Sequence, residues 1–243
     1  MIMLQHIILI IENSKRRGKS SSFLHILEKI VNYIFGGIYM TSFKNSETKI
    51  NLMRAFAGES QARNRYTFAA EIAKKQKLYV IEAIFNFTAN QELAHANIFM
   101  KHLSEVTGEN IEADGSYPVE VTNSVIELLE NAAHNEFEEF DNIYKSFAET
   151  AEREGNLPVA SSFKEIAKIE KTHSERFKLF AELLKTNKLF VSDVECEWMC
   201  LNCGNIYKGK NVPEVCPVCH HEKGYFVRLE LAPYTCKETN KIC

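Results

Sequence analysis

Two Glu-x-x-His pairs constrain this chain more than any other feature of its sequence. One pair is Glu92 and His95, and the other is Glu170 and His173. Around each pair the apolar residues recur every three or four positions, and both pairs fall on the apolar stripe that faces the core. A carboxylate that faces the core costs several kcal/mol unless a partner compensates its charge. The pattern therefore favours a bound metal ion.

Four long segments have this helical periodicity. They cover residues 48–75, 80–106, 122–154 and 158–185. Thr122 or Asn123 is the expected N-cap of the third helix. Residues 107–121 contain two glycines and a proline, are long for a simple turn, and predict a crossover connection. Four amphipathic helices with one long connection and inward carboxylates predict a mainly α protein, with a ferritin-like four-helix bundle over residues 40–188.

The inward faces of these helices carry the residues of a dinuclear metal site. Such a site takes one Glu from each of two helices and a Glu-x-x-His pair from each of the other two. The predicted ligands are Glu59, Glu92, His95, Glu136, Glu170 and His173. Glu139, about one turn beyond Glu136, is an additional carboxylate on a stripe that continues to Ile143 and Phe147. Oxygen and imidazole ligands suit iron and manganese, and zinc would also bind.

Each of these residues has a simpler explanation when taken alone. A lone Glu-x-x-His pair is usually accidental, and a lone buried Glu is usually paired with Arg. Two pairs and two further carboxylates on four inward faces are hard to obtain by chance, so we interpret them as one site. Tyr66 and Tyr144 lie within two helical turns of Glu59 and Glu139, respectively. They are either core tyrosines with satisfied hydroxyls or residues that orient a ligand carboxylate by a hydrogen bond.

The cysteines predict a second metal site. Five of the seven lie between Cys196 and Cys219, which argues for metal binding in a reducing compartment rather than for a disulfide framework. Two Cys-x-x-Cys pairs with 12 residues between them form a four-thiolate signature: Cys200, Cys203, Cys216 and Cys219. Trp198, Tyr207 and Phe226 would form the core of this small domain. The metal is zinc or a single iron, and a redox-capable dinuclear site in the same chain favours iron.

The segments around this domain lack comparable chemistry. We expect residues 189–195 to be a linker, residues 196–232 to form the four-thiolate domain and residues 233–243 to be a tail. The cysteines outside the signature are expected not to be ligands: Cys196, Cys236 and Cys243.

Composition excludes some classes of protein. The net charge is −3, from 29 basic and 32 acidic residues without a block of either sign, so binding to nucleic acid or to an anionic membrane is not indicated. The apolar start MIMLQHIILII is only 11 residues long, so a stable membrane span is not expected. We expect the working protein to start at Met40, with residues 1–39 as upstream sequence. The alternative is a basic, serine-containing segment for organelle targeting or membrane-surface binding.

Residues 40–232 resemble the rubrerythrin family. The resemblance rests on FAGESQARNRY (56–66), NQELAH (90–95), EFEEFDNIY (136–144), IEKTHSERF (169–177) and the paired Cys-x-x-Cys unit. It implies a di-iron site in which Glu139 joins the six predicted ligands, and in which the equivalents of Glu139 and His95 exchange as ligands when one iron changes oxidation state. Glu139 thus separates this family from plain ferritin. The resemblance also implies a rubredoxin-like domain with one iron on the four cysteines, although His220 stands where many free-standing rubredoxins have Gly.

The resemblance implies a cytoplasmic oxidoreductase that reduces hydrogen peroxide to water in oxidative-stress defence. Electrons would pass from the rubredoxin-like iron to the di-iron site across a homodimer, and Glu139, Tyr66 and Tyr144 are the expected catalytic residues. The chain has no dinucleotide-binding fingerprint, so NAD(P)H would act through a separate reductase or rubredoxin. The alternatives are a ferroxidase or iron-storage protein, which needs no four-thiolate unit, and a zinc-stabilised sensor without turnover.

Overall fold

The structure is a computed structural model that describes residues 42–234. The expected start at Met40, the segment 1–39, Cys236, Cys243 and the tail from residue 235 onward lie outside the described residues. No helix among residues 42–234 is long and apolar enough to cross a membrane.

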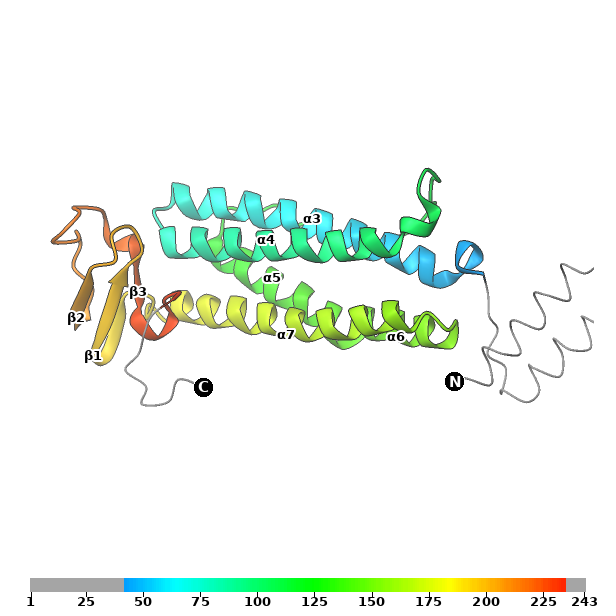
Figure 1. Cartoon of the computed structure of the whole chain (residues 1–243). Coiled ribbons are helices and arrows are strands. Elements are labelled where there is room, and N and C mark those ends of the chain that lie inside the picture. Colours follow the sequence, from blue (N-terminus) through cyan, green and yellow to red (C-terminus); the bar gives the residue numbers. More distant parts are fainter. Residues whose placement is uncertain (1–41, 235–243) are drawn as a thin grey trace, which may run out of the picture.

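The described helices form an elongated bundle (Figure 1). Its long helices are α3 (Glu47–Lys75), α4 (Tyr79–His102), α5 (Val125–Glu138), α6 (Tyr144–Arg153) and α7 (Leu157–Lys185). A π-helical turn, η3 (Glu139–Ile143), joins α5 to α6, and the 3-10 turns η1 (Phe43–Asn45) and η2 (Ser104–Val106) precede α3 and follow α4. The bundle contains four long helical segments, and α5, η3 and α6 together form the third of them. This is the predicted mainly α, ferritin-like arrangement.

Serine side chains cap two of these helices. The Ser46 hydroxyl accepts a hydrogen bond from the backbone N–H of Lys49 at the start of α3. At the start of α5 the Ser124 hydroxyl accepts from the N–H of Glu127 at 3.3 Å. The prediction of Thr122 or Asn123 as this cap was therefore wrong, because the helix begins one or two residues later.

Two short turns and one long connection join the helices of the bundle. A short turn at residues 76–78 places α3 and α4 side by side, and a short turn at residues 154–156 does the same for α6 and α7 (Figure 1). The connection 107–124 has no helix or strand. It is attached at both ends of α3, where Lys44 binds Glu109 and the Gln76 amide donates to the carbonyl of Asn123. It is thus the expected crossover, and it runs along the bundle.

The π-helical turn changes which side chains of the third helix face inward. The uninterrupted helix expected over residues 122–154 would have buried Ile143 and Phe147. In the structure Ile143 is 37% exposed, whereas Tyr144 is 1% exposed and Ala148 is 1% exposed. A π turn contains one more residue than an α turn, so it advances the inward stripe by one position. The prediction for this stripe was wrong at Ile143, whereas Phe147 is half-buried against the core. Tyr144 lies in the core, as one of the two expectations for it required.

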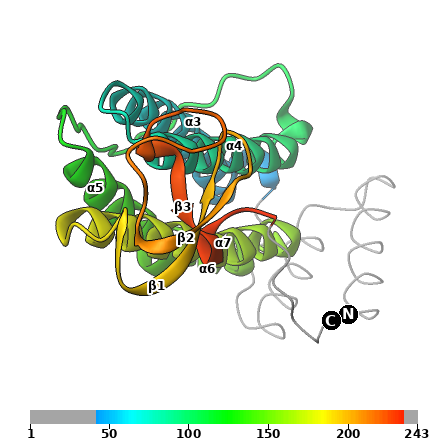
Figure 2. The same ribbon diagram turned by 90° about the vertical axis from the view of Figure 1, so that its left-hand side faces the viewer.

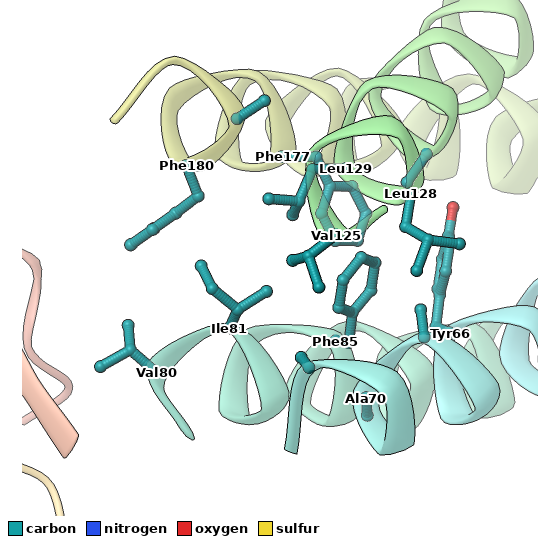
Figure 3. Close-up of a cluster of buried hydrophobic side chains, with 14 of the residues drawn as sticks. Tyr66, Ala70, Val80, Ile81, Phe85, Val125, Leu128, Leu129, Phe177 and Phe180 are labelled. Carbon is teal, nitrogen blue, oxygen red and sulfur yellow. The ribbon is translucent and has the colours of Figure 1, made fainter. Parts of the chain in front are cut away.

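Apolar clusters fill the bundle on both sides of its middle. One contains Tyr66, Phe85, Leu129 and Phe177 and lies toward the strands (Figure 3). The other contains Leu52, Phe99, Tyr144, Phe163 and Ile166. The predicted metal ligands lie between them in the sequence of every helix, so the site occupies a polar layer between two apolar layers.

A small three-stranded sheet follows α7. Strands β1 (Val191–Cys200), β2 (Ile206–Asn211) and β3 (Phe226–Arg228) are antiparallel in the order β2-β1-β3, with the 3-10 turns η4 (Lys223–Tyr225) and η5 (Leu229–Leu231) beside β3. Residues 191–195, expected as part of a linker, are the first residues of β1. Trp198 and Phe226 are fully buried and Tyr207 packs against them, as the sequence predicted.

The sheet domain is docked on one end of the bundle (Figures 1 and 2). The ring of Tyr225 stacks on that of Tyr79, at the start of α4, with a centroid distance of 4.0 Å. Lys77 forms an ion pair with Glu222. Gly224 lies so close to the carbonyl of Lys77 that a Cβ atom there would be 1.8 Å from the carbonyl oxygen, so only glycine fits this contact.

Candidate dinuclear and four-thiolate metal centres

The six predicted dinuclear ligands converge in the polar layer of the bundle. Glu59 comes from α3, Glu136 from α5, and one Glu-x-x-His pair comes from each of α4 and α7. None of the six is more than 4% exposed: Glu59, Glu92, His95, Glu136, Glu170 and His173. Helical periodicity alone therefore brings every one of them to the same buried layer.

Their donor atoms form two overlapping groups. In one group the donor atoms of Glu59, Glu92, His95 and Glu170 all lie within 4.8 Å of one another. In the other the same holds for Glu92, Glu136, Glu170 and His173. Glu92 and Glu170 belong to both groups, so each can offer one oxygen to each of two ions. This is the donor arrangement of a carboxylate-bridged dinuclear site, with one terminal Glu and one terminal His per ion.

The imidazole nitrogens already point at the carboxylates. His95 Nδ1 lies 2.9 Å from Glu170 Oε1 and 3.0 Å from Glu92 Oε2. His173 Nδ1 lies 2.7 Å from Glu170 Oε2 and 3.0 Å from Glu92 Oε1. Each histidine therefore faces one oxygen of Glu92 and one oxygen of Glu170, and the other histidine faces the remaining two. This agrees with the division of the donor atoms into two groups.

The charges of this layer are far from balanced by protein groups. Burial raises the pKa of Glu59 and of Glu136 well above the usual range, and the neighbouring carboxylates raise them further. Burial opposes the charged form of Glu92 as well, but its interactions with the nearby imidazoles of His173 and His95 outweigh burial and lower its pKa to about 2. For His95, burial is outweighed by Glu170 and Glu92, which raise its pKa to about 9.

Whether metal ions fit this layer can be judged from the buried ligand atoms and from which of them make a hydrogen bond of good geometry. Seven of them make none, although some lie within ion-pair distance of an imidazole: Glu59 Oε2, Glu92 Oε1, Glu136 Oε2, both carboxylate oxygens of Glu170 and both ring nitrogens of His173. Buried polar atoms are normally satisfied, so a cluster of this size requires an explanation. Two cations of charge +2 or +3 would satisfy these atoms and neutralise the carboxylates. The donor set of oxygen and imidazole nitrogen suits iron.

Two buried tyrosines hold the terminal carboxylates. The Tyr66 hydroxyl donates to Glu136 Oε1, and the Tyr144 hydroxyl donates to Glu59 Oε1. The sequence placed each tyrosine near a Glu of its own helix, but both hydrogen bonds cross between helices. Each tyrosine belongs to one of the two apolar clusters, so its ring is fixed by packing while its hydroxyl reaches the polar layer.

Glu139 lies beside the two donor groups without belonging to either. It is the first residue of the π-helical turn, and it is half-buried. Burial raises the pKa of Glu139 well above the usual range, and Glu136, Glu170 and Glu92 raise it further. Glu139 and Tyr144 both line a cavity of about 890 Å³ between α3, the crossover connection and the π turn.

Sequence reasoning missed the polar residues around this cavity. Arg54 donates to the carbonyl and the carboxylate of Asp114 in the connection. Arg65 forms an ion pair with Glu120 at 3.0 Å, and Glu120 also accepts from the Asn135 amide. The two arginine contacts join residues 60 and 55 positions apart, and the Glu120–Asn135 contact joins the connection to α5. No local sequence pattern could have indicated them.

Removal of metal is expected to make stability fall with rising pH. In the metal-free protein Glu59, Glu136 and Glu139 have folded-state pKa values above the ordinary 4.5, so the folded state binds their protons more tightly. This contribution is complete below pH 4.5 and is lost as the pH rises through the raised values. The contribution of His95 is complete below pH 6.5 and is lost progressively as the pH rises to about 9.

The melting temperature of the chelated protein, measured by circular dichroism, should therefore fall by several degrees between pH 5 and pH 8. One pKa unit is worth about 1.4 kcal/mol, and 1 kcal/mol corresponds to roughly 2–4 °C in a protein of this size. The iron-loaded protein is the control and should lack this fall, because its carboxylates are already ionised and compensated. A constant or rising melting temperature in the chelated protein would contradict the expectation.

The four cysteines of the sheet domain form the second centre. Their sulfur atoms all lie within 4.8 Å of one another, and the distances Cys200 Sγ to Cys219 Sγ and Cys203 Sγ to Cys216 Sγ are both 3.8 Å. A tetrahedral ion with metal–sulfur bonds of about 2.3 Å separates its sulfurs by roughly 3.8 Å, so the site has the size of a tetrathiolate metal. Cys196 is not part of this group, and its sulfur lies 3.9 Å from the carbonyl oxygen of Gly209.

Two similar backbone loops hold these sulfurs. In each loop the residue after the second cysteine has a positive φ, +76° at Gly204 and +59° at His220. Its N–H donates to the carbonyl of the first cysteine, at 2.8 Å for Gly204 and 3.0 Å for His220. A left-handed backbone costs a side-chain-bearing residue roughly 1–2 kcal/mol, so His220 is strained where Gly204 is not.

Replacing His220 by glycine is accordingly expected to stabilise the thiolate domain. The gain should be about 0.5–1 kcal/mol, because the relief of strain exceeds the entropy that glycine adds to the unfolded chain. The measurement is the guanidinium midpoint for loss of the metal–thiolate absorption. Gly204→Ala is the matched control: nothing lies within 4 Å of a Cβ atom there, so backbone strain alone should lower the midpoint. Equal shifts in the same direction would contradict this account.

The comparisons with known proteins agree with both centres. The family model described as Rubrerythrin matches residues 51–186, and the model described as Rubrerythrin, rubredoxin-like domain matches residues 198–227. The chain belongs to the rubrerythrin family. Rubrerythrin-1 of Clostridium acetobutylicum is 46% identical over 189 residues, which cover 77% of this chain and 96% of that protein. The rubrerythrin of Nitratidesulfovibrio vulgaris is 38% identical over 190 residues.

Solved structures show the same architecture. A mixed-valence state of nigerythrin matches with a TM-score of 0.51 and 27% identity, over 79% of this chain and 92% of that one. The bacterioferritin of Desulfovibrio desulfuricans matches with a TM-score of 0.52 at 20% identity, which is a likeness of fold. This rubrerythrin-family chain therefore combines a ferritin-like di-iron domain, with carboxylate and histidine ligands, and a four-cysteine rubredoxin-like domain.

Proposed function

We propose that this protein is a non-haem di-iron peroxidase that reduces hydrogen peroxide to water and protects against oxidative stress. The observation that carries the proposal is the presence of two redox-capable centres in one chain, since a ferritin-like bundle that only stores iron has no use for the four-thiolate domain. The balanced reaction takes up two electrons and two protons and releases two water molecules. Solved structures of nigerythrin include mixed-valence and all-ferrous states, which supports iron as the metal that changes oxidation state here.

Each of the two donor groups would hold one of the two ions. Glu92 and Glu170 would bridge, Glu59 and His95 would complete one ion, and Glu136 and His173 would complete the other. Bound iron would supply the two electrons. The Tyr66 and Tyr144 hydroxyls align Glu136 and Glu59, because each donates to one carboxylate oxygen and leaves the other oxygen free.

Peroxide would enter through the cavity beside Glu139. The cavity is lined by Glu139 and Tyr144, and also by the amide side chains of Gln61, Asn135 and Asn142. Amide side chains can hydrogen-bond a small polar molecule along this path. Glu139 has a raised pKa and lies within the layer, so it is placed to hold a proton and deliver it to a departing oxygen.

Electron supply favours a homodimer. Tyr79, where the rubredoxin-like domain docks, and Glu92 are 13 residues apart on α4, which corresponds to about 20 Å along the helix. Transfer between subunits would shorten this path. The outer faces of α4 and α7 expose large apolar side chains that a second subunit could cover: Phe87, Leu93, Ile98, Met100, Ile169 and Leu179. A separate NAD(P)H-dependent reductase, or a rubredoxin, would donate the electrons, and the cysteine usage fits a cytoplasmic location.

Anaerobic stopped-flow on the dithionite-reduced protein tests the peroxidase. Both centres should reoxidise at a rate that rises with peroxide and is much faster than with dioxygen. In Glu139→Ala the fast phase should be lost, while Asp141→Ala, an exposed carboxylate in the same π turn, should react like the parent protein. A fast reaction with dioxygen alone and accumulating mineral would indicate a ferroxidase or storage protein. Zinc on the thiolates and no visible colour would indicate a sensor without turnover.

A further inference from the structure

Arg176 is a half-buried cation beside the dinuclear layer, and its direct contacts are with neutral groups. It lies on α7, three residues after His173, and its guanidinium donates to the Thr88 hydroxyl at 2.9 Å and to Gln91 Oε1 at 3.1 Å. It also stacks over the ring of Phe87 at 5.0 Å. Among residues 42–234 no Asp or Glu lies within ion-pair distance of it, and its partners are a hydroxyl, an amide oxygen and a ring.

The hydrogen bonds of Arg176 direct its charge toward the metal ligands. Gln91 is adjacent to Glu92, and Thr88 precedes Glu92 by one helical turn, so the guanidinium is held about one turn from this bridging carboxylate. Thr88 is fully buried. Burial lowers the pKa of Arg176, and the carboxylates of Glu136, Glu92 and Glu170 oppose that change, so the charge and the ligands interact through space.

An uncompensated cation near a redox centre favours the reduced state. Reduction of the dinuclear centre removes positive charge from the layer, and Arg176 repels the more positive oxidised state more strongly than the reduced one. A unit charge at roughly 10 Å, with an effective dielectric constant of about 20, changes such an equilibrium by about tenfold or somewhat more. Partial exposure of Arg176 reduces this effect but does not change its sign.

We propose that Arg176 is a positioning residue that raises the reduction potential of the dinuclear centre and fixes the α4 segment that carries Glu92. The inference rests on the redox-active dinuclear iron of the proposed function, but not on peroxide as its substrate. Arg176 does not contact the reacting atoms in this account. It acts through its charge and through the segment Phe87 to Gln91.

The test is a redox titration of the iron-loaded full chain without peroxide. The diferric, mixed-valence and diferrous populations are followed by electron paramagnetic resonance, and the four-thiolate iron in the same sample is followed by its visible bands. In Arg176→Met the dinuclear potential should fall by about 59 mV per one-electron step if the ratio of states changes tenfold. The four-thiolate potential should not change. Arg176→Lys, which keeps the charge, should retain most of the dinuclear potential.

Lys178→Met is the matched control, because Lys178 is an exposed cation on the same helix. It should leave both potentials unchanged. Three results would overturn the proposal: an unchanged dinuclear potential in Arg176→Met, an equal shift in Lys178→Met, or Arg176→Lys behaving like Arg176→Met in potential. An unchanged potential with a lower melting temperature would assign Arg176 a purely structural role. Failure of the peroxidase hypothesis would appear only in the stopped-flow reaction with peroxide and would leave these titrations intact.

Discussion

The Glu170→Gln variant is expected to retain one iron per chain where the parent protein holds three. Glu170 belongs to both donor groups and is fully buried, and its two carboxylate oxygens face the Nδ1 atoms of His95 and His173 without a hydrogen bond of good geometry. Glutamine has almost the same shape, but its amide is neutral and offers one oxygen, so it cannot bridge two cations. Loss of this shared ligand should weaken both sites together by well over the roughly 10–100-fold that loss of an outer partner costs.

Metal analysis per chain, together with the visible bands of the four-thiolate iron, measures this result. The visible bands should be unchanged, because the two centres share no ligand. Glu165→Gln is the matched control on the same helix, since Glu165 is exposed and pairs with Lys168. Its iron content should equal that of the parent protein. A Glu170→Gln protein that still binds three irons would show that the bridging position is assigned to the wrong residue.

The metal ligands could be predicted because they obey the periodicity of the helices that carry them. An inward face is defined by 3.6 residues per turn, so Glu92 and His95, or Glu170 and His173, are placed by their apolar neighbours alone. The same reasoning failed at Ile143. Periodicity assumes an uninterrupted α-helix, and the sequence EFDNI contains no local signal that predicts a π turn. The extra residue of this turn places Tyr144 on the inward face and leaves Ile143 exposed.

Contacts between segments far apart in the sequence could not be predicted either, because they depend on how the helices pack against one another. Tyr66 pairs with Glu136 and Tyr144 with Glu59, because a tyrosine hydroxyl extends past its own helix to the neighbouring one. The role of Arg176 likewise depends on how α4 and α7 are aligned. Its sequence position gave no indication of this role, and only the packed structure places its guanidinium against Thr88 and Gln91.

The Cys216→Ser variant is expected to separate the two halves of the proposed reaction. Cys216 is fully buried, and its sulfur lies 3.8 Å from that of Cys203, so its loss should remove the four-thiolate iron. Turnover driven by NAD(P)H and a reductase should then fall to the rate seen without the reductase. The dinuclear centre shares no ligand with Cys216, so chemically reduced protein should still be reoxidised by peroxide in a single turnover at about the parental rate.

Two further proteins make this result decisive. Cys196→Ser changes a cysteine outside the donor group and should leave both reactions intact. Zinc at the four thiolates of the parent chain preserves the tetrahedral site but cannot change oxidation state, so it should reproduce the Cys216→Ser defect without disturbing the fold. If the zinc form sustained normal reductase-linked turnover, electrons would reach the dinuclear centre by another route. The rubredoxin-like domain would then serve the structure through its contact with Tyr79, rather than electron transfer.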